Sequence, residues 1–285
     1  MKYNFLRFPG GKAKAVTFSY DDGCPYDVKL LEIMNRFGLK CTFNLVGEKI
    51  AAEAPLSKDF IKENIIGGGH EIACHGYYHR AQNRIRPLEG IREVIDCRQI
   101  LEDSFGIIVR GMAYPDSVVN RFHEPDAYKR VREQISCLEL AYVRSGDGDN
   151  QLFTLPEDWY NWIPTAHHDN PRIMTYIDSF NEIDPNMLYS SVRYPRLFYL
   201  WGHSYEFENN GNWEHLETIC QKLSGKENVW YATNIEICDY VKAYKSLQYS
   251  VDGTLVYNPT LYDIWFDVDG RLYCIKPGQT LSVKP

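Results

Sequence analysis

Short apolar runs alternate with segments of helical periodicity along most of the chain. Apolar runs of strand length cover 14–20, 39–47, 70–76, 107–115 and 196–204. Helical spacing of apolar residues covers 25–38, 57–69, 87–106, 126–142 and 171–183, and the segments 212–225 and 228–247 complete the alternation. This order predicts βα units around a parallel sheet.

The pattern changes near Gln248. From there to the end of the sequence, apolar and polar residues alternate around two Asp-Gly dipeptides, at Asp252 and Asp269. Such alternation is typical of β-hairpins. The sequence therefore predicts an α/β domain over 1–247 and a small β-appendage over 248–285 packed on it.

Composition and charge exclude some functions. With 285 residues, 44% of them hydrophobic, and a net charge of −7, the chain resembles an ordinary globular protein. The negative charge disfavours nucleic acid or an anionic membrane as a partner. No stretch predicts a signal peptide or a membrane span, and the eight cysteines form no CxxC pair. We therefore expect a cytoplasmic protein with reduced thiols.

Polar residues follow several of the predicted strands. The carboxyl ends of parallel strands share one rim, so we expect these residues to converge on one cleft. Taken singly, each has an ordinary alternative, since paired aspartates before glycine often form solvated turns and most histidines only donate hydrogen bonds. Their joint occurrence favours a site. The residues are Asp21, Asp22, His75, His79, Arg110 and His203.

The chemistry of this set suits a hydrolase that uses a divalent metal ion. Two imidazoles and one carboxylate can hold such an ion and leave positions open for water and substrate. A second carboxylate can act as general base, and a separate histidine as general acid. Because adjacent strand residues point to opposite faces, Asp21 and Asp22 can share a site only where the strand ends.

Four segments resemble successive motifs of the polysaccharide deacetylases (carbohydrate esterase family 4). They read SYDDG, GHEIACHGYYH, RGMAYP and LFYLWGHS, and the similarity extends from about Lys14 to about Ala243. The resemblance implies a distorted (β/α) barrel and an enzyme that removes N- or O-acetyl groups from sugars.

Carried over to this sequence, the resemblance implies a role for each residue. Asp21 would be the general base, and Asp22, His75 and His79 would hold the metal. Arg110 would pair with Asp21, and the backbone N–H of Tyr114 would stabilise the oxyanion. His203 would be the acid that protonates the leaving group.

Two motifs depart from the family pattern. RGMAYP has one more residue between arginine and tyrosine than the usual Arg-Pro-Pro-Tyr. The fourth motif has its nearest counterpart in LPEDWYNWIPTAHH, where Trp159 and Trp162 could form a substrate wall or pack in the core. His167 and His168, in the same segment, could line the cleft or serve only as hydrogen-bonding groups.

The sequence thus predicts a metal-dependent deacetylase acting on an acetylated sugar or oligosaccharide. One divalent ion is expected, zinc first, with cobalt, nickel or manganese also compatible. We expect a carboxylate partner for His203, with Asp158 favoured over Glu206. Two alternatives stay open: a related metal hydrolase of a cyclic amide or imide, and a catalytically silent carbohydrate-binding relative. The sequence indicates no oligomeric state.

Overall fold

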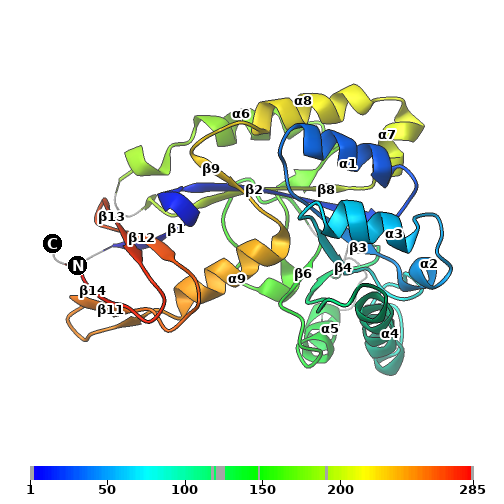
Figure 1. Ribbon diagram of the computed structural model, residues 1–285, viewed down its shortest axis with the longest axis horizontal. Coiled ribbons are helices and arrows are strands. Elements are labelled where there is room, and N and C mark those ends of the chain that lie inside the picture. The colour runs from blue at the N-terminus through cyan, green and yellow to red at the C-terminus, as the bar shows by residue number, and fades with distance from the viewer. Residues whose placement is uncertain (1–2, 117–118, 120–125, 147, 190–191, 284–285) are drawn as a thin grey trace.

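A curled parallel sheet of eight strands forms the centre of the fold (Figure 1). The computed structural model describes residues 3–116, 119, 126–146, 148–189 and 192–283. The strands follow the order β6-β5-β4-β3-β2-β8-β7, and β9 also pairs with β2. Their bounds are β2 Lys14–Asp22, β3 Cys41–Leu45, β4 Glu71–Cys74, β5 Gly111–Ala113, β6 Tyr142–Arg144, β7 Ala166–His167, β8 Arg196–Gly202 and β9 Val229–Tyr231.

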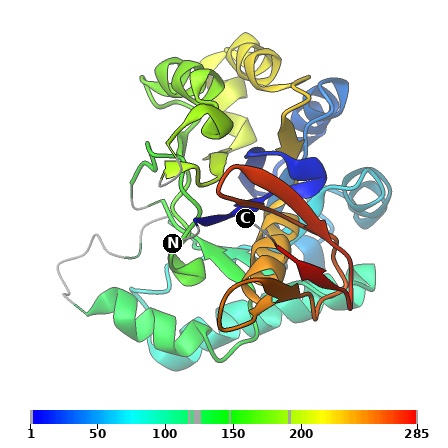
Figure 2. The same cartoon turned by 90° about the vertical axis from the view of Figure 1, so that its left-hand side faces the viewer.

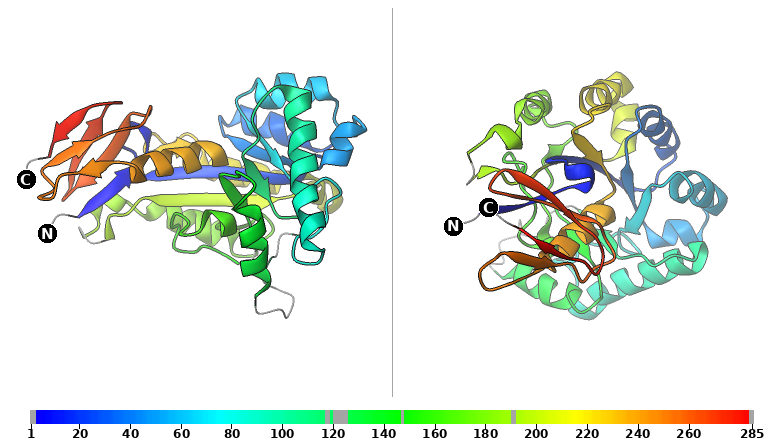
Figure 3. Two further views of the ribbon diagram at one scale, coloured as in Figure 1. Left: turned by 90° about the horizontal axis from the view of Figure 1, so that it is seen from below. Right: turned by 60° about the vertical axis from the view of Figure 1, so that its left-hand side comes forward.

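Helices surround this sheet, as the right-hand view of Figure 3 shows. Their apolar faces pack on the outside of the strands, where they bury most of the main hydrophobic core. Their bounds are α1 Asp27–Arg36, α2 Gly47–Ala51, α3 Lys58–Phe60, α4 Pro87–Phe105, α5 Ala127–Ile135, α6 Ile173–Glu182, α7 Ser204–Asn210, α8 Trp213–Leu223 and α9 Asn234–Lys245.

One extended segment connects the two edges of the sheet. At its start, the backbone N–H of Trp162 donates to the carbonyl of Val143 in β6, at 3.0 Å. Four residues later, Ala166 of β7 pairs in parallel with Leu200 of β8. The sheet therefore curls into a distorted barrel, and the predicted fold class is confirmed.

The strands at one edge of the barrel are shorter than the sequence indicates. The predicted strand 107–115 contains only the three residues of β5. The predicted helix 126–142 ends early, because α5 stops at Ile135 and the chain turns at Glu139, where φ is 55°. The strand β6 then begins at Tyr142, a residue that the helical pattern had included.

The C-terminal residues and the N-terminal strand β1 together form two three-stranded antiparallel sheets. β10 begins at Gln248, where the sequence pattern changes. Asp269 and Gly270 make the two-residue turn between β12 and β13, with φ values of 49° and 90°, as an Asp-Gly hairpin favours. The strands are β10 Gln248–Tyr249, β11 Leu255–Tyr257, β12 Ile264–Val268, β13 Arg271–Ile275 and β14 Thr280–Ser282.

The N-terminal strand β1 (Asn4–Arg7) lies in this appendage and not in the barrel. It pairs antiparallel with β12, so that Asn4 faces Val268. The predicted division at residue 247 left this strand in the barrel domain, because four residues carry too little pattern to show their partner. Figure 2 shows β1 and the C-terminal strands together.

A second apolar core joins the appendage to α9. Leu6 of β1 and Phe266 of β12 are buried in it together with Ile237 and Val241 of α9. The appendage lies on the side from which β2 enters the sheet (Figure 3). It is therefore remote from the carboxyl end of β2.

Two further features concern thiols and membranes. All eight cysteines are free. Within the described ranges, no helix combines the length and the apolar character needed to cross a bilayer.

Candidate active site

Asp21 and Asp22 end the central strand β2. Asp21 is fully buried, whereas Asp22 is partly exposed. Regular strand geometry would turn them to opposite faces, but Asp22 has a φ of 80°. This left-handed conformation is unfavourable for a residue other than glycine, and it interrupts the alternation. Both carboxylates can therefore face one rim of the barrel.

Asp22 forms a cluster with two histidines from the loop after β4. Its Oδ1 lies 3.3 Å from Nε2 of His79 and 3.5 Å from Nε2 of His75. The three ligand atoms all lie within 4.8 Å of one another. Neighbouring ligands of a tetrahedral zinc ion are about 3.3 Å apart, given bonds of about 2.0 Å. The geometry of this Asp22 cluster thus fits a divalent ion.

Contacts behind the histidines fix their orientation. Nδ1 of His75 lies 2.9 Å from the carbonyl oxygen of Ala113. Because a carbonyl oxygen only accepts hydrogen bonds, the ring proton must be on Nδ1. Nε2 is therefore free to bind a metal. Burial lowers the pKa of His75 to about 4, although the charge of Asp21 partly opposes this shift. The ring is therefore neutral at physiological pH, as a ligand must be. The loop itself is held by buried Glu93, which accepts a hydrogen bond from the backbone N–H of Tyr78 at 2.9 Å.

Asp21 has a different set of partners. Its Oδ2 is paired with the guanidinium of Arg144, at the end of β6, and its Oδ1 accepts a hydrogen bond from Nδ2 of Asn44 at 2.8 Å. Burial alone would raise the pKa of Asp21, but Arg144 and His75 lower it, and the result lies below the ordinary value. The carboxylate is thus ionised and held in place beside the Asp22 cluster.

His203 stands between Asp21 and a third carboxylate. Its Nε2 lies 3.9 Å from Oδ2 of Asp21, and its Nδ1 lies 3.2 Å from Oε2 of Glu206 in α7. Burial lowers the pKa of His203, but Glu206 and Asp21 outweigh this effect, so the pKa lies above the usual value. His203 can therefore carry a proton near neutral pH.

The comparisons with known proteins agree with this geometry. The family model described as "Polysaccharide deacetylase" matches residues 9–129, which include Asp21, Asp22 and both histidines of the cluster. Over these residues, which are less than half of its length, the chain is similar to the polysaccharide deacetylase family.

Chitin deacetylase 1 of Cryptococcus neoformans var. grubii is a curated protein that is similar to this chain. The two are 22% identical over 143 residues, which cover 50% of this chain and 28% of the relative. The chain thus matches only about a quarter of the length of that protein.

Solved structures show the same fold. A structure from Mycobacterium smegmatis assigned to the polysaccharide deacetylases has a TM-score of 0.56 and 16% identity, covering 84% of this chain and 94% of that one. A mutant of a CE4 family pseudoenzyme from Bacillus anthracis, described as having restored enzymatic activity, has a TM-score of 0.51 and 16% identity, covering 82% and 70%. At these identities the likeness concerns the fold.

The prediction that Arg110 pairs with Asp21 is wrong. The guanidinium of Arg110 pairs with Asp239 of α9, with Nη1 donating to Oδ1 at 3.0 Å. Arg110 immediately precedes β5, so it lies at the opposite end of that strand from the rim. Arg144, which the sequence analysis did not select, supplies the guanidinium to Asp21 from the next strand.

The prediction that the backbone N–H of Tyr114 faces an oxyanion is also wrong. This N–H donates to the carbonyl of Arg144, at 3.0 Å, as part of the pairing between β5 and β6. The phenol of Tyr114 donates to the carbonyl of Tyr160, at 3.0 Å. Tyr114 is buried, and its N–H is already used within the barrel.

The two predicted wall tryptophans lie in the core. Trp162 is 1% exposed, and its ring packs edge-on against Tyr142 and Tyr199. Trp159 packs against Trp162, with ring centroids 4.8 Å apart, in the core shared with α9. Core packing, the alternative left open above, is the observed role, so the substrate-wall prediction is wrong. A third tryptophan, Trp201, is half-buried and lies beside the site, with its ring centroid 5.9 Å from that of His203.

The prediction that Asp158 is the carboxylate partner of His203 is also wrong. Asp158 is bonded to the phenol of Tyr128 and to Nε of Arg132, at 2.9 Å for the latter. Glu206, the second choice, faces His203 because a capping box at the start of α7 folds it back onto the His203 backbone N–H, at 3.0 Å. The spacing of three residues is the signal that identifies it.

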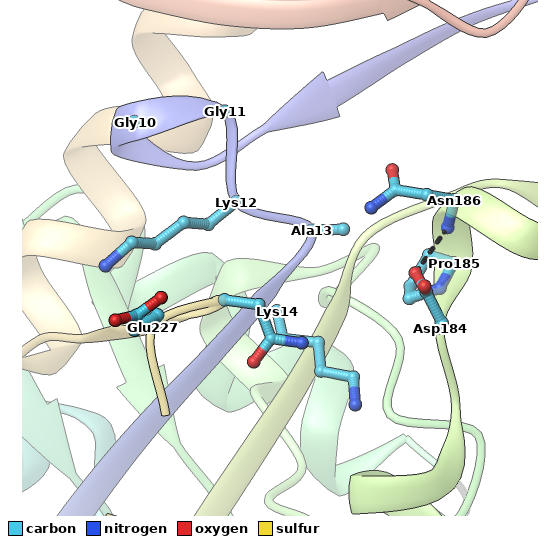
Figure 4. A pocket seen from close by; sticks show the side chains of 10 residues that line it. Gly10, Gly11, Lys12, Ala13, Lys14, Asp184, Pro185, Asn186 and Glu227 are labelled. Carbon is cyan, nitrogen blue, oxygen red and sulfur yellow. Dashed lines mark hydrogen bonds between the residues drawn. The ribbon is translucent and has the colours of Figure 1, made fainter. Parts of the chain in front are cut away.

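Another cavity lies at the opposite end of the barrel, where β2 enters the sheet (Figure 4). Lys12 and Lys14 line it, but each ammonium group is already bonded to backbone carbonyls, Lys12 to that of Val229 at 3.1 Å and Lys14 to that of Phe180 at 2.8 Å. Both ammonium groups are thus partly engaged by the backbone of the barrel.

Proposed function

We propose that this protein is a metal-dependent hydrolase that removes acetyl groups from an N-acetylated or O-acetylated sugar. The supporting observation is that two adjacent carboxylates have different partners. Asp22 faces the two histidines, at 3.3 and 3.5 Å, while Asp21 is held beside them by Arg144. This arrangement separates a metal ligand from a general base.

Asp22, His75 and His79 would hold the ion, with zinc as the first candidate. An ion bound there supplies a Lewis acid for the acetyl carbonyl and lowers the pKa of water at the site. The remaining chemistry comes from residues of the chain.

Asp21 is placed to take a proton from the attacking water. Its lowered pKa keeps it ionised near neutral pH, and its pairing with Arg144 and Asn44 fixes its orientation. In the reaction, the water oxygen forms a bond to the acetyl carbon while its proton passes to Asp21.

His203 is placed to protonate the leaving group. Its Nε2 faces the Asp21 side of the site and its Nδ1 faces Glu206, whose negative charge stabilises the imidazolium. As the bond between the acetyl carbon and the sugar nitrogen or oxygen breaks, Nε2 donates its proton to that atom. The products are acetate and the free amine or hydroxyl.

Aromatic rings beside His203 support a sugar as the substrate. The rings of Trp201 and Tyr205 have centroids 5.9 and 5.1 Å from that of His203, and both residues are half-buried. Such rings offer a flat apolar face and a polar edge, which suits the stacking of a sugar ring. They replace the predicted wall of Trp159 and Trp162.

An assay on a panel of substrates tests the proposal. The zinc-loaded protein is incubated with oligomers of N-acetylglucosamine, acetylated xylo-oligosaccharides and a cyclic imide, and acetate and ring-opened product are measured. Acetate release over many turnovers supports the proposal. Ring opening alone would favour the cyclic-amide alternative, and oligosaccharide binding without product would favour the silent relative.

A further inference from the structure

Four side chains with metal-binding atoms lie on the far side of His203 from the Asp22 cluster. His167 ends β7, His168 and Asp169 follow it, and Glu206 lies in the first turn of α7. One ligand atom from each lies within 4.8 Å of the others. The proposed reaction uses only Glu206 of this set, so the remaining three need a separate explanation.

His168 is held in one orientation by its neighbours. Its ring is fully buried and packs against Phe207, with a centroid distance of 4.1 Å, and against Tyr20, at 5.8 Å. Its Nδ1 edge packs on Gly202, where a Cβ would lie only 2.0 Å from Nδ1. A side chain at position 202 would therefore collide with the ring of His168. The close packing also restricts rotation of this imidazole.

Among the described residues, neither ring nitrogen of His168 makes a hydrogen bond of regular geometry. Nε2 nevertheless points into the cluster, lying 3.2 Å from Oε2 of Glu206 and 3.5 Å from Oδ1 of Asp169. Burial of a polar nitrogen without a well-aligned hydrogen bond is unfavourable. Nε2 of this rigidly held imidazole is therefore available to bind an ion together with the two carboxylates.

The spacings are those of a metal site. The distances of 3.2 and 3.5 Å around His168 match the 3.3 and 3.5 Å found in the Asp22 cluster. Both sets agree with the separation of about 3.3 Å between neighbouring ligands of tetrahedral zinc. We propose that His168, Asp169 and Glu206 form a second binding site for a divalent transition-metal ion.

His167 occupies the fourth position of this second site. Its Nε2 lies 3.1 Å from Oε2 of Glu206, but its Nδ1 accepts a hydrogen bond from the backbone N–H of Asp169, at 3.2 Å. That bond places the ring proton on Nε2, so His167 must change tautomer before Nε2 can bind an ion. We therefore assign the site to the other three residues. Mixed imidazole and carboxylate ligands suit zinc, cobalt or nickel.

Zinc stoichiometry measured on the full chain tests the proposal independently of any activity. Wild type, His79→Ala, the double variant Asp169→Asn/Glu206→Gln and the triple combination are equilibrated with zinc, and bound metal is counted by elemental analysis. We expect two ions in the wild type, one in each of the first two variants and none in the triple variant. The cobalt forms of the two single-site proteins should give different visible spectra, because their ligand sets differ.

Thermal stability gives a second readout. In His79→Ala, added zinc should still raise the melting temperature, because an ion that binds only the native state stabilises it, and this rise should disappear in the triple variant. Asp178→Asn, which changes an exposed carboxylate in α6, is the matched control and should bind as the wild type does.

Two results would overturn the proposal. One is a wild type with a single ion and a His79→Ala variant with none. The other is a second ion that persists undiminished in Asp169→Asn/Glu206→Gln, which would mean an adventitious ion only. Both results concern zinc content alone, and the ion of the proposed deacetylation lies in the Asp22 cluster. Because Glu206 also faces His203, activity of the Glu206→Gln variants is not used as a readout of the second site.

Discussion

Arg144 and Asp21 form a fully buried ion pair between the ends of two strands, 123 residues apart in the sequence. The pair matters because an unpaired buried carboxylate would take up a proton and could no longer act as a base. Arg144 also lies over the ring of Trp201, with its Cζ 4.3 Å from the ring centroid. One guanidinium thus connects the base to the aromatic side of the site.

Replacement of Arg144 should move the acid limb of the pH–rate profile. In Arg144→Met the pKa of Asp21 should rise, because its main cation is lost, so the ionised base should appear only at higher pH. We expect the acid limb of the kcat/KM profile to move to higher pH by about one unit or more. Arg110→Met, which removes the arginine selected from the sequence, should leave that limb in place.

The Arg144 variant also has a stability cost. Removal of one partner from a buried pair typically costs about 3–5 kcal/mol, so the melting temperature must be measured first. An acid limb that moves in Arg110→Met and stays in Arg144→Met would contradict the assignment.

The two adjacent aspartates should give opposite phenotypes. Asp21→Asn should keep the zinc of the Asp22 cluster and lose about 10²-fold or more in kcat, the scale expected for a lost general base. Asp22→Asn should instead lower the zinc content. Elemental analysis and steady-state kinetics on the same preparations check both statements, and the reverse outcome would show that the roles are exchanged.

Glu206 should determine the position of the alkaline limb of the pH–rate profile. In Glu206→Gln, His203 loses the carboxylate that raises its pKa, so the imidazolium should deprotonate at lower pH and the alkaline limb should move down. Asp158→Asn is the control, because Asp158 bonds to Tyr128 and Arg132 and not to His203. If the alkaline limb follows Asp158 instead, the assignment of Glu206 fails.

The appendage should contribute stability without affecting the ion. Phe266 of β12 is fully buried between the appendage and α9. Phe266→Ala should lower the free energy of unfolding by about 3–5 kcal/mol. Zinc bound to the Asp22 cluster should stay unchanged at temperatures where the variant is folded. A variant with wild-type stability in chemical denaturation would show that the appendage does not depend on this core.

Three of the predicted site residues lie next to long, regular strands, whereas His75 and His79 follow the four-residue strand β4 and were identified by their motif. β2 and β8 are nine and seven residues long, and their apolar runs point directly to Asp21, Asp22 and His203. Arg144 escaped prediction because β6 has three residues, too few for a recognisable period.

The tryptophans were misassigned for a related reason. Trp162 starts the irregular segment that closes the barrel, and no local pattern shows that its side chain turns into the core. Asp158 was preferred over Glu206 because it lies beside Trp159 in the segment nearest to the family's fourth motif. The capping box at the start of α7 was the better signal, since it fixes Glu206 against His203 through local geometry.

Reversible metal dependence tests the central claim most directly. The protein is stripped with a chelator, zinc is restored stepwise, and acetate release from the substrate found in the panel is followed together with bound metal. We predict that acetate release disappears on stripping and returns as zinc fills the Asp22 cluster. His79→Ala should stay inactive at every zinc level, and the control Asp178→Asn should behave as the wild type. Full acetate release by the stripped protein, or by His79→Ala, would contradict the account.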